Sequence, residues 1–169
     1  MELKAQVDDL GLVREKLIRL KARHVGTFRQ TDVYFEVPEG RLKLREMEGY
    51  NEAELVYYER ENIAGPKRSD VFILKVPKPD LFKALLRKAL KVRSTVEKTR
   101  EIYRYQGTRI HLDRVEGLGS FVEFEKETAA DPESMKKNEQ KLKALMEKLG
   151  ISPESLMEFS YGDLSRSVK

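Results

Sequence analysis

The sequence predicts an α+β domain in which antiparallel β-hairpins are joined by a few helices. Three observations support this class. Many short segments alternate apolar and ionisable residues with a period of two, as strands with one buried face do. Turn-forming triplets such as Pro-Glu-Gly and Gly-Leu-Gly separate these segments. Helical spacing of apolar residues is confined to a few separate stretches, so the strands are expected to pair with their neighbours in the chain.

The first half of the chain is expected to hold five strands and one helix. The first strand covers residues 1–7. A helix follows over residues 9–23, with Asp8 or Asp9 as its cap and an apolar face of Leu10, Val13, Leu17 and Leu20. His24 would then interact with the helix dipole at its C-terminal end. Alternation predicts further strands over residues 31–37, 41–47, 53–61 and 71–76, with a loop at 62–70.

The second half is expected to begin with a helix from Asp80 to about Lys91 that buries Leu81, Leu85, Leu86 and Leu90. Strands should follow over residues 94–105, 108–116 and 120–127. Asp131-Pro132 is a helix start with proline at the first helical position, and this helix should end at Gly150. A last short helix begins near residue 152, and residues 160–169 are expected to be irregular or weakly helical.

Composition limits the classes of protein to consider. A chain of 169 residues suits one domain, residues 1–169. The net charge of +4 is compatible with nucleic acid, acidic lipid or a phosphorylated small molecule as partner. The absence of cysteine excludes disulfides, cysteine zinc sites and a thiol nucleophile. No apolar run reaches the ~18 residues of a membrane span, and no signal sequence is evident, so we expect a cytoplasmic protein without a membrane partner.

Five predicted strands carry an ionisable face opposite an apolar one. The ionisable sets are Glu2 with Lys4; Arg41, Lys43 and Arg45; Lys98 with Arg100; Arg109, His111 and Asp113; and Glu123 with Glu125. An antiparallel sheet with one face in water shows the same alternation. Here, however, the charges are segregated by strand. This segregation favours a sheet curled into a tunnel, in which basic strands face paired carboxylates.

Such a lining suits a polyphosphate held together with a metal ion. Arginine and lysine neutralise phosphate oxygens, and arginine can do so with two hydrogen bonds. Carboxylates repel phosphate unless a hard cation such as Mg²⁺ or Mn²⁺ bridges the two groups. The sequence therefore predicts a site for Mg²⁺ or Mn²⁺ and a polyphosphate.

The chain resembles the CYTH superfamily, also called triphosphate tunnel metalloenzymes. The resemblance rests on "ELKAQV", "QTDVYFEVPEGRLKLRE", "YYERENIAGPKRSD", "VEKTREIY", "IHLDRVEGLGSFVEFE" and "EFSYGDL", which occur in the family's order and spacing. It is nearest to the class IV adenylyl cyclase-like branch through "GPKRSD", "VEGLGSFVEFE" and "SYGDL". The resemblance implies a closed, eight-stranded antiparallel β-tunnel with helices packed outside.

The resemblance also implies roles for individual residues. The implied phosphate ligands are Lys4, Arg41, Lys43, Arg45, Lys98 and Arg100, of which Lys4, Arg45, Lys98 and Arg100 form the catalytic set. The implied metal ligands are Glu2, Asp113, Glu123 and Glu125. The chain departs from the family pattern twice. The first glutamate of the N-terminal ExExK signature would precede Met1. In addition, Tyr57-Tyr58-Glu59-Arg60 stands where relatives often have a phosphate-binding lysine, and Arg60 or Lys67 is expected to replace that lysine.

Several functions remain open from the sequence. The leading expectation is cyclase-like conversion of ATP to cyclic AMP and pyrophosphate; the alternative is a triphosphatase acting on tripolyphosphate, thiamine triphosphate or a nucleotide. A non-catalytic sensor is a third hypothesis, and nucleic-acid binding is disfavoured because no module signature is present. His111 could bind phosphate or assist proton transfer, although a passive hydrogen-bonding role is favoured. Tyr161 could close a tunnel mouth or anchor the tail. Either a monomer or a homodimer is expected.

Overall fold

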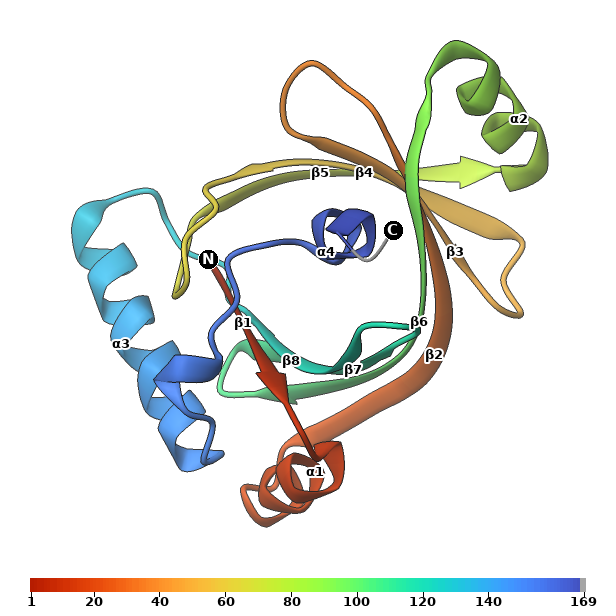
Figure 1. The fold of residues 1–169 in the computed structure, drawn as a ribbon. Coiled ribbons are helices and arrows are strands. Elements are labelled where there is room, and N and C mark those ends of the chain that lie inside the picture. The colour runs from red at the N-terminus through yellow and green to blue at the C-terminus, as the bar shows by residue number, and fades with distance from the viewer. Residues whose placement is uncertain (168–169) are drawn as a thin grey trace.

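The computed structural model describes residues 1–167, which form one eight-stranded antiparallel sheet, four α-helices and a short 3₁₀ helix (Figure 1). The strands are β1 (Glu2–Val7), β2 (Arg23–Phe35), β3 (Arg41–Met47), β4 (Glu52–Arg60), β5 (Ser69–Pro77), β6 (Val92–Tyr105), β7 (Thr108–Val115) and β8 (Gly119–Glu125). The helices are α1 (Leu10–Arg19), α2 (Pro79–Ala89), α3 (Pro132–Lys148), the 3₁₀ helix η1 (Pro153–Ser155) and α4 (Tyr161–Ser167). The predicted α+β class is confirmed.

The sheet has the strand order β1-β8-β7-β6-β2-β3-β4-β5. It curls strongly, so that β1, β7 and β8 lie across from β4 and β5, and α4 sits inside the curve (Figure 1). The long strands β2 and β6 pair from Arg23 to Phe35 and form the back of this curve. The concave face therefore receives every second side chain of all eight strands.

The outer strand β1 contacts the loop that precedes the other outer strand, β5, at one point. The backbone N–H groups of Glu2 and Lys67 each donate to the other's carbonyl at 2.8 Å. Farther along β1, the edge is occupied by the segment after η1, because Ala5 pairs with Leu156 and Met157 N–H donates to the Lys4 carbonyl at 2.9 Å. That segment takes positions on the β1 edge that β5 would need for continuous pairing. The structure thus shows a curled sheet with one bridging contact between its ends.

Two apolar clusters cover the convex face. Helices α1 and α3 pack on β1, β6, β7 and β8, with a fully buried centre that includes Leu3, Leu17, Ile110, Leu142 and Phe124. Helix α2 covers the opposite part of the sheet through partly buried Phe82, Leu86 and Leu90. The helices therefore fix the outer face and leave the concave face to polar side chains and α4. None of the helices within residues 1–167 has the length and apolar character needed to cross a bilayer.

The third apolar cluster lies on the concave face, where α4 packs against the sheet. Tyr161 is buried, and its ring centroid lies 5.0 Å from that of Phe121. Gly162 presses against the Tyr34 ring so closely that an added Cβ would lie 2.8 Å from a ring carbon. The absence of a side chain at residue 162 is what allows this approach. Of the predicted tail, residues 161–167 are helical, and residues 168–169 lie outside the described part.

Most predicted elements are present. Asp9 caps α1 and accepts a hydrogen bond from Gly11 N–H at 2.6 Å, and Asp131 caps α3 in the same way for Ser134. The dipole role predicted for His24 is wrong, because α1 ends at Arg19 and His24 belongs to β2. Pairing with β6 extends β2 back through this polar stretch, a tertiary effect that periodicity does not reveal.

The burial predicted for α2 is partly wrong. Leu81 and Leu85 are 72% and 59% exposed, since the helix rests on the sheet through the side that carries Phe82 and Leu86, with Leu90 just beyond its end. Nor does Asp80 cap this helix: the cap position is Lys78, in the left-handed region with φ of 54°, and it makes no side-chain capping bond.

Candidate active site on the concave face

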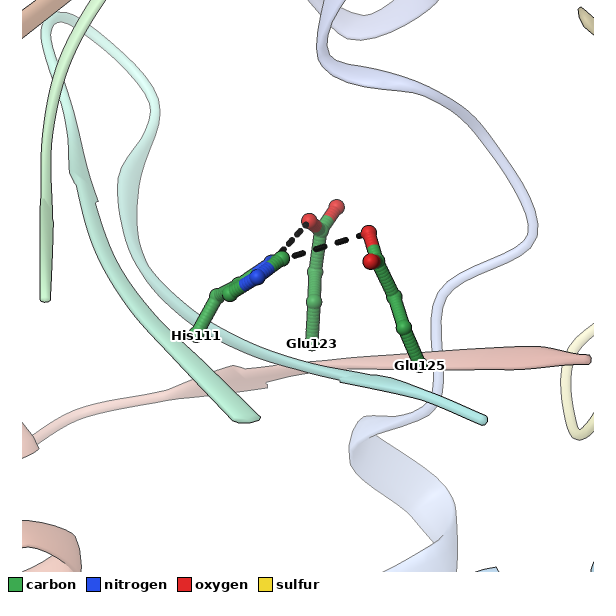
Figure 2. Close-up of side chains that lie close together, drawn as sticks. All are labelled: His111, Glu123 and Glu125. Carbon is green, nitrogen blue, oxygen red and sulfur yellow. Dashed lines mark ion pairs between the residues drawn. The ribbon is translucent and has the colours of Figure 1, made fainter. Parts of the chain in front are cut away.

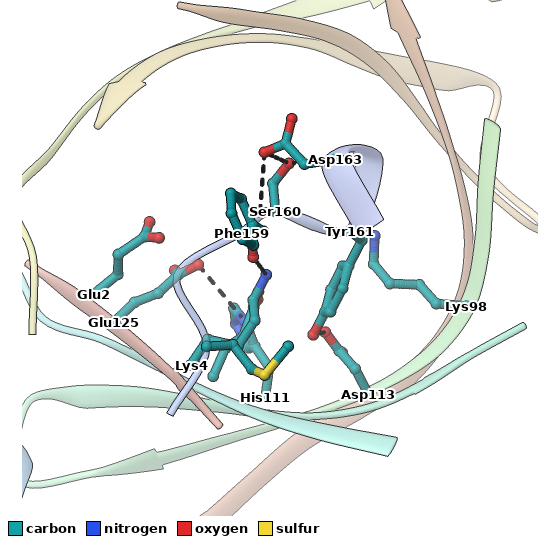
Figure 3. Close-up of polar contacts among 12 residues, drawn as sticks. Glu2, Lys4, Lys98, His111, Asp113, Glu125, Phe159, Ser160, Tyr161 and Asp163 are labelled. Carbon is teal, nitrogen blue, oxygen red and sulfur yellow. Dashed lines mark hydrogen bonds and ion pairs between the residues drawn. The ribbon is translucent and has the colours of Figure 1, made fainter. Parts of the chain in front are cut away.

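Strand register brings basic and acidic side chains together on the concave face. Asp32 on β2 stands opposite Arg45 on β3, and Arg100 on β6 stands opposite Asp113 on β7. Glu123 on β8 lies between two partners, Lys4 on β1 and His111 on β7. Directly opposed residues in antiparallel strands have Cβ atoms about 5 Å apart, so these pairs are in reach of one another. Figure 3 shows several of these side chains pointing into the space around α4.

Asp32 is the centre of a buried cationic cluster. Its carboxylate is fully buried and accepts from Lys98 Nζ at 2.5 Å, Lys43 Nζ at 3.0 Å and Arg45 Nε at 2.8 Å. Three positive groups from two strands, β3 and β6, thus share one carboxylate. The cluster retains excess positive charge in a site of low exposure, which favours binding of a multiply charged anion.

The pKa values in this cluster follow from burial and charge. Burial opposes ionisation of Asp32, but Arg45, Lys43 and Lys98 outweigh it and hold the pKa of the carboxyl well below its usual range. Burial lowers the pKa of Lys98 to about 7 and that of Lys43 to about 8, and neighbouring arginines add to the effect in both. An incoming polyphosphate would favour the charged form of both lysines.

A second buried group joins β6, β7 and α4. Arg100 donates to both oxygens of Asp113, at 2.7 and 2.5 Å, and also to Glu123 at 2.6 Å. The Tyr161 hydroxyl donates to Asp113 at 2.8 Å. Burial opposes ionisation of Asp113, but Arg100 keeps the pKa of its carboxyl below the ordinary value. Asp113 therefore accepts three hydrogen bonds, two from Arg100 and one from Tyr161, and these bonds hold Arg100 and α4 in place.

Three side chains from β7 and β8 form a candidate metal site (Figure 2). His111, Glu123 and Glu125 each offer a ligand atom, and these atoms lie within 4.8 Å of one another. Burial raises the cost of ionising Glu123, yet Lys4 and Arg100 outweigh it and hold the pKa of Glu123 well below its usual range. Carboxylate oxygens with one imidazole nitrogen are a donor set that divalent ions accept.

The β1 side chains link this cluster to its surroundings. Lys4 Nζ lies 3.0 Å from Glu123 and 3.7 Å from the centroid of the Tyr161 ring. Glu2 instead accepts a hydrogen bond on Oε1 at 2.6 Å from Arg60 Nη1, at the end of β4. Lys4 is thus placed between the metal candidates and the cationic cluster, a position suited to a phosphate that bridges the two.

A cavity of about 380 Å³ at one end of β3 is lined by three arginines, Arg41, Arg60 and Arg93. The Asp163 carboxylate on α4 reaches into it, accepting from Arg41 at 3.1 Å and from Arg93 at 2.5 Å. The Nε atoms of Arg60 and Arg93 are buried without a hydrogen-bond partner among the described residues. A larger opening of about 790 Å³ at the other end of β3 reaches Lys98.

Comparison with known proteins places the chain in a family. Residues 1–161 match the CYTH domain. The chain belongs to the CYTH domain family. A Methanocaldococcus jannaschii protein, provisionally named an adenylate cyclase, is 27% identical over 174 residues, which cover 97% of each chain.

Solved structures agree with this assignment. A Pyrococcus horikoshii protein is 27% identical, with a TM-score of 0.83 over 97% of this chain and 98% of the other. A Hippeastrum protein described as a candidate adenylyl cyclase with a dominant triphosphatase activity is 17% identical, with a TM-score of 0.72 over 99% and 95% of the two chains. At that level of identity the Hippeastrum structure shows the shared fold alone.

In this CYTH protein, most of the predicted site residues share the concave face. The structure brings together Lys4, Lys43, Arg45, Lys98, Arg100, His111, Asp113, Glu123 and Glu125 through the contacts described above. Arg41 and Arg60 line the arginine-lined cavity. Glu2 stands opposite the metal candidate Glu125 in the sheet, but its carboxylate binds Arg60.

Lys67 has a different position from the one expected of a phosphate ligand. It is buried, and its ammonium donates to the carbonyls of Ile63, Met157 and Glu158 at 2.6, 3.0 and 3.3 Å. Burial lowers the pKa of Lys67 to about 8. These contacts tie the loop before β5 to the segment before α4, so Lys67 joins the two ends of the sheet.

Three functional candidates were missing from the sequence-based set: Asp32, Arg93 and Asp163. Asp32 could have been found by the alternation rule, because Asp32 and Tyr34 share the face opposite Val33 and Phe35. Arg93 and Asp163 had no such signal, since their pairing depends on where α4 docks.

Proposed function

We propose that this CYTH protein binds a triphosphate together with a divalent metal ion on its concave face and hydrolyses it. The observation that carries the proposal is the cluster in which Lys43, Arg45 and Lys98 share the single carboxylate of Asp32. Buried cations that outnumber their counter-ion are suited to a ligand that brings several negative charges. The family and the charge of the site agree on this class of ligand.

The residues present fit the metal ion that the family implies. His111, Glu123 and Glu125 offer oxygen and nitrogen donors within a sphere of suitable size, and they lie next to Lys4 and Arg100. A bound ion would supply neutralisation of phosphoryl oxygens and polarisation of the phosphorus under attack. Lys4 and Arg100 would then turn from Glu123 to the phosphate chain, and Asp113 would keep Arg100 oriented.

Hydrolysis is favoured over cyclisation by the state of the aromatic side chains. Tyr34, Tyr58 and Tyr161 on the concave face are all buried by protein contacts, so none presents an open ring for a nucleobase. Tripolyphosphate contains no nucleobase and therefore needs no such aromatic contact. The Hippeastrum protein is described as having a dominant triphosphatase activity, so the shared fold is compatible with hydrolysis. A cyclase acting on ATP is the second candidate, and the name of the M. jannaschii relative supports it.

A product assay separates the two candidates. Purified protein is incubated with tripolyphosphate or with ATP, each with Mg²⁺ or Mn²⁺, and the products are resolved by chromatography. We expect phosphate and pyrophosphate from tripolyphosphate at a higher kcat/KM than any product from ATP. Cyclic AMP with pyrophosphate as the main outcome would establish the cyclase instead. Turnover of neither compound by the metal-loaded protein would contradict the proposal.

A matched pair of variants ties any activity to the site. Glu125→Gln removes one charge from the metal candidates, whereas Glu139→Gln removes one from an exposed pair with Lys143 on α3. We expect loss of turnover in the first variant and wild-type turnover in the second.

A further inference from the structure

His111 is a buried imidazole without a hydrogen bond. Its exposure is 2%, and neither ring nitrogen has a hydrogen-bond partner among residues 1–167. Buried polar groups in folded proteins are almost always paired, and an unpaired one calls for an explanation such as a ligand. The position is fixed by strand register, since His111 on β7 stands directly opposite Glu123 on β8. The imidazole is therefore buried beside two carboxylates.

The spacing around His111 is too wide for hydrogen bonds and suited to an ion. Nδ1 lies 3.6 Å from Glu123 Oε2 and 3.7 Å from Glu125 Oε1, beyond the usual limit of about 3.2 Å for a hydrogen bond. A divalent ion with bonds of about 2.1 Å separates opposite ligands by about 4.2 Å. The three ligand atoms fall within 4.8 Å of one another, and Figure 2 shows the side chains converging.

We propose that His111 Nδ1 is a direct nitrogen ligand of the metal ion and gives the site a preference for Mn²⁺ over Mg²⁺. This inference rests on the proposed function, because it concerns the ion that accompanies the triphosphate. Mg²⁺ binds oxygen ligands and gives up its waters reluctantly. Mn²⁺ also prefers carboxylates, but as a first-row transition metal it binds mixed nitrogen and oxygen sites as well. With Glu2 engaged by Arg60, the imidazole is the third donor that the described cluster offers beside two carboxylates.

The charges nearby determine when the ion binds. Glu123 is held by Lys4 at 3.0 Å and by Arg100 at 2.6 Å, and Glu125 by Arg109 at 3.3 Å. A cation placed among three positive groups is repelled unless an anion engages those groups. The ion should therefore bind together with the polyphosphate, whose oxygens take over Lys4 and Arg100. The test is accordingly made with tripolyphosphate present.

Electron spin echo spectroscopy of Mn²⁺ gives a direct readout, because a coordinated ¹⁴N nucleus modulates the echo. The ternary complex of protein, Mn²⁺ and tripolyphosphate should show imidazole ¹⁴N modulation, which changes to a ¹⁵N pattern when histidine is ¹⁵N-labelled. The chain has two histidines, and the other, His24, is exposed on β2. His24→Gln should keep the modulation, whereas His111→Phe should lose it.

Metal competition gives a second readout. We expect the Mg²⁺ concentration that displaces half of the bound Mn²⁺ to fall about tenfold in His111→Phe relative to His24→Gln. Mn²⁺ bound without nitrogen modulation in wild-type protein would overturn the assignment of His111 and leave the triphosphate proposal intact. Modulation that survives in His111→Phe would overturn it as well. Failure to form any ternary complex would overturn both proposals, and tripolyphosphate turnover is measured separately on the same samples.

Discussion

Replacement of Asp32 by asparagine tests the central electrostatic claim. The fully buried carboxylate contacts Lys98, Lys43 and Arg45 at 2.5 to 3.0 Å. The substitution preserves shape but removes the carboxylate that buried Lys98 and Lys43 share with partly buried Arg45. Removing one partner of a buried ion pair costs about 3–5 kcal/mol. For a domain of this size, 1 kcal/mol shifts Tm by about 2–4 °C, so Tm should fall by about 6–20 °C.

Calorimetry or fluorescence-monitored melting of Asp32→Asn measures this fall directly. The matched control is Glu48→Gln, where the same kind of charge is removed from an exposed pair with Arg29, and its free energy of unfolding should change by no more than about 0.5 kcal/mol. Equal Tm values for the two variants would refute the claim that Asp32 holds the cluster together.

Tripolyphosphate should partly rescue the Asp32→Asn variant. An anion that binds only the folded state raises Tm by mass action, and a site in which Arg45, Lys43 and Lys98 no longer bind an internal carboxylate should bind it more tightly. The ligand-induced gain in Tm is therefore expected to be larger in Asp32→Asn than in wild-type protein. A smaller gain would mean that Asp32 positions the cations rather than competing with the ligand.

Three further outcomes are expected. Glu123→Gln and Glu125→Gln should each lower metal-stimulated turnover about 100-fold or more, because a catalytic metal ion contributes several kcal/mol. The circular dichroism spectra should be unchanged. Near-normal rates would remove both residues from the site. Asp163→Asn should tighten tripolyphosphate binding about tenfold in titration calorimetry, because Arg41 loses an internal competitor, and an unchanged Kd would contradict this. Without ligand the pKa of Lys98 is about 7, so this side chain is mostly neutral at pH 8. Tripolyphosphate binding at pH 8 should therefore take up protons, and the affinity should fall as pH rises above 7. Calorimetry in two buffers of different ionisation enthalpy should show less proton uptake in Lys98→Arg.

The sequence predicted the faces of the strands well, because a period of two is a property of the extended backbone itself. Arg41, Lys43 and Arg45 share the concave face as their spacing requires, and Glu123 and Glu125 do the same on β8. These assignments need no knowledge of the partner strand.

Features that depend on tertiary contacts were not predictable in this way. The hydrogen bond from Tyr161 to Asp113 joins residues 48 positions apart, and nothing in either local segment announces it. The sequence offered Lys67 as a possible phosphate ligand, yet its ammonium donates to three backbone carbonyls of distant segments. The N-terminal half of β2, with its polar residues around His24, is a strand because the long strand β6 lies beside it.

Helix α4 lies inside the curved sheet, where its side chains contact polar groups that an anionic ligand would otherwise contact. Asp163 occupies the arginines at one end of the concave face, and Tyr161 holds Asp113 deeper inside. Chloride offers a single charge, whereas a chain of phosphates can engage several of these cations at once. Selection among anions in the cell would then follow from the number of linked charges a solute offers and less from its outline.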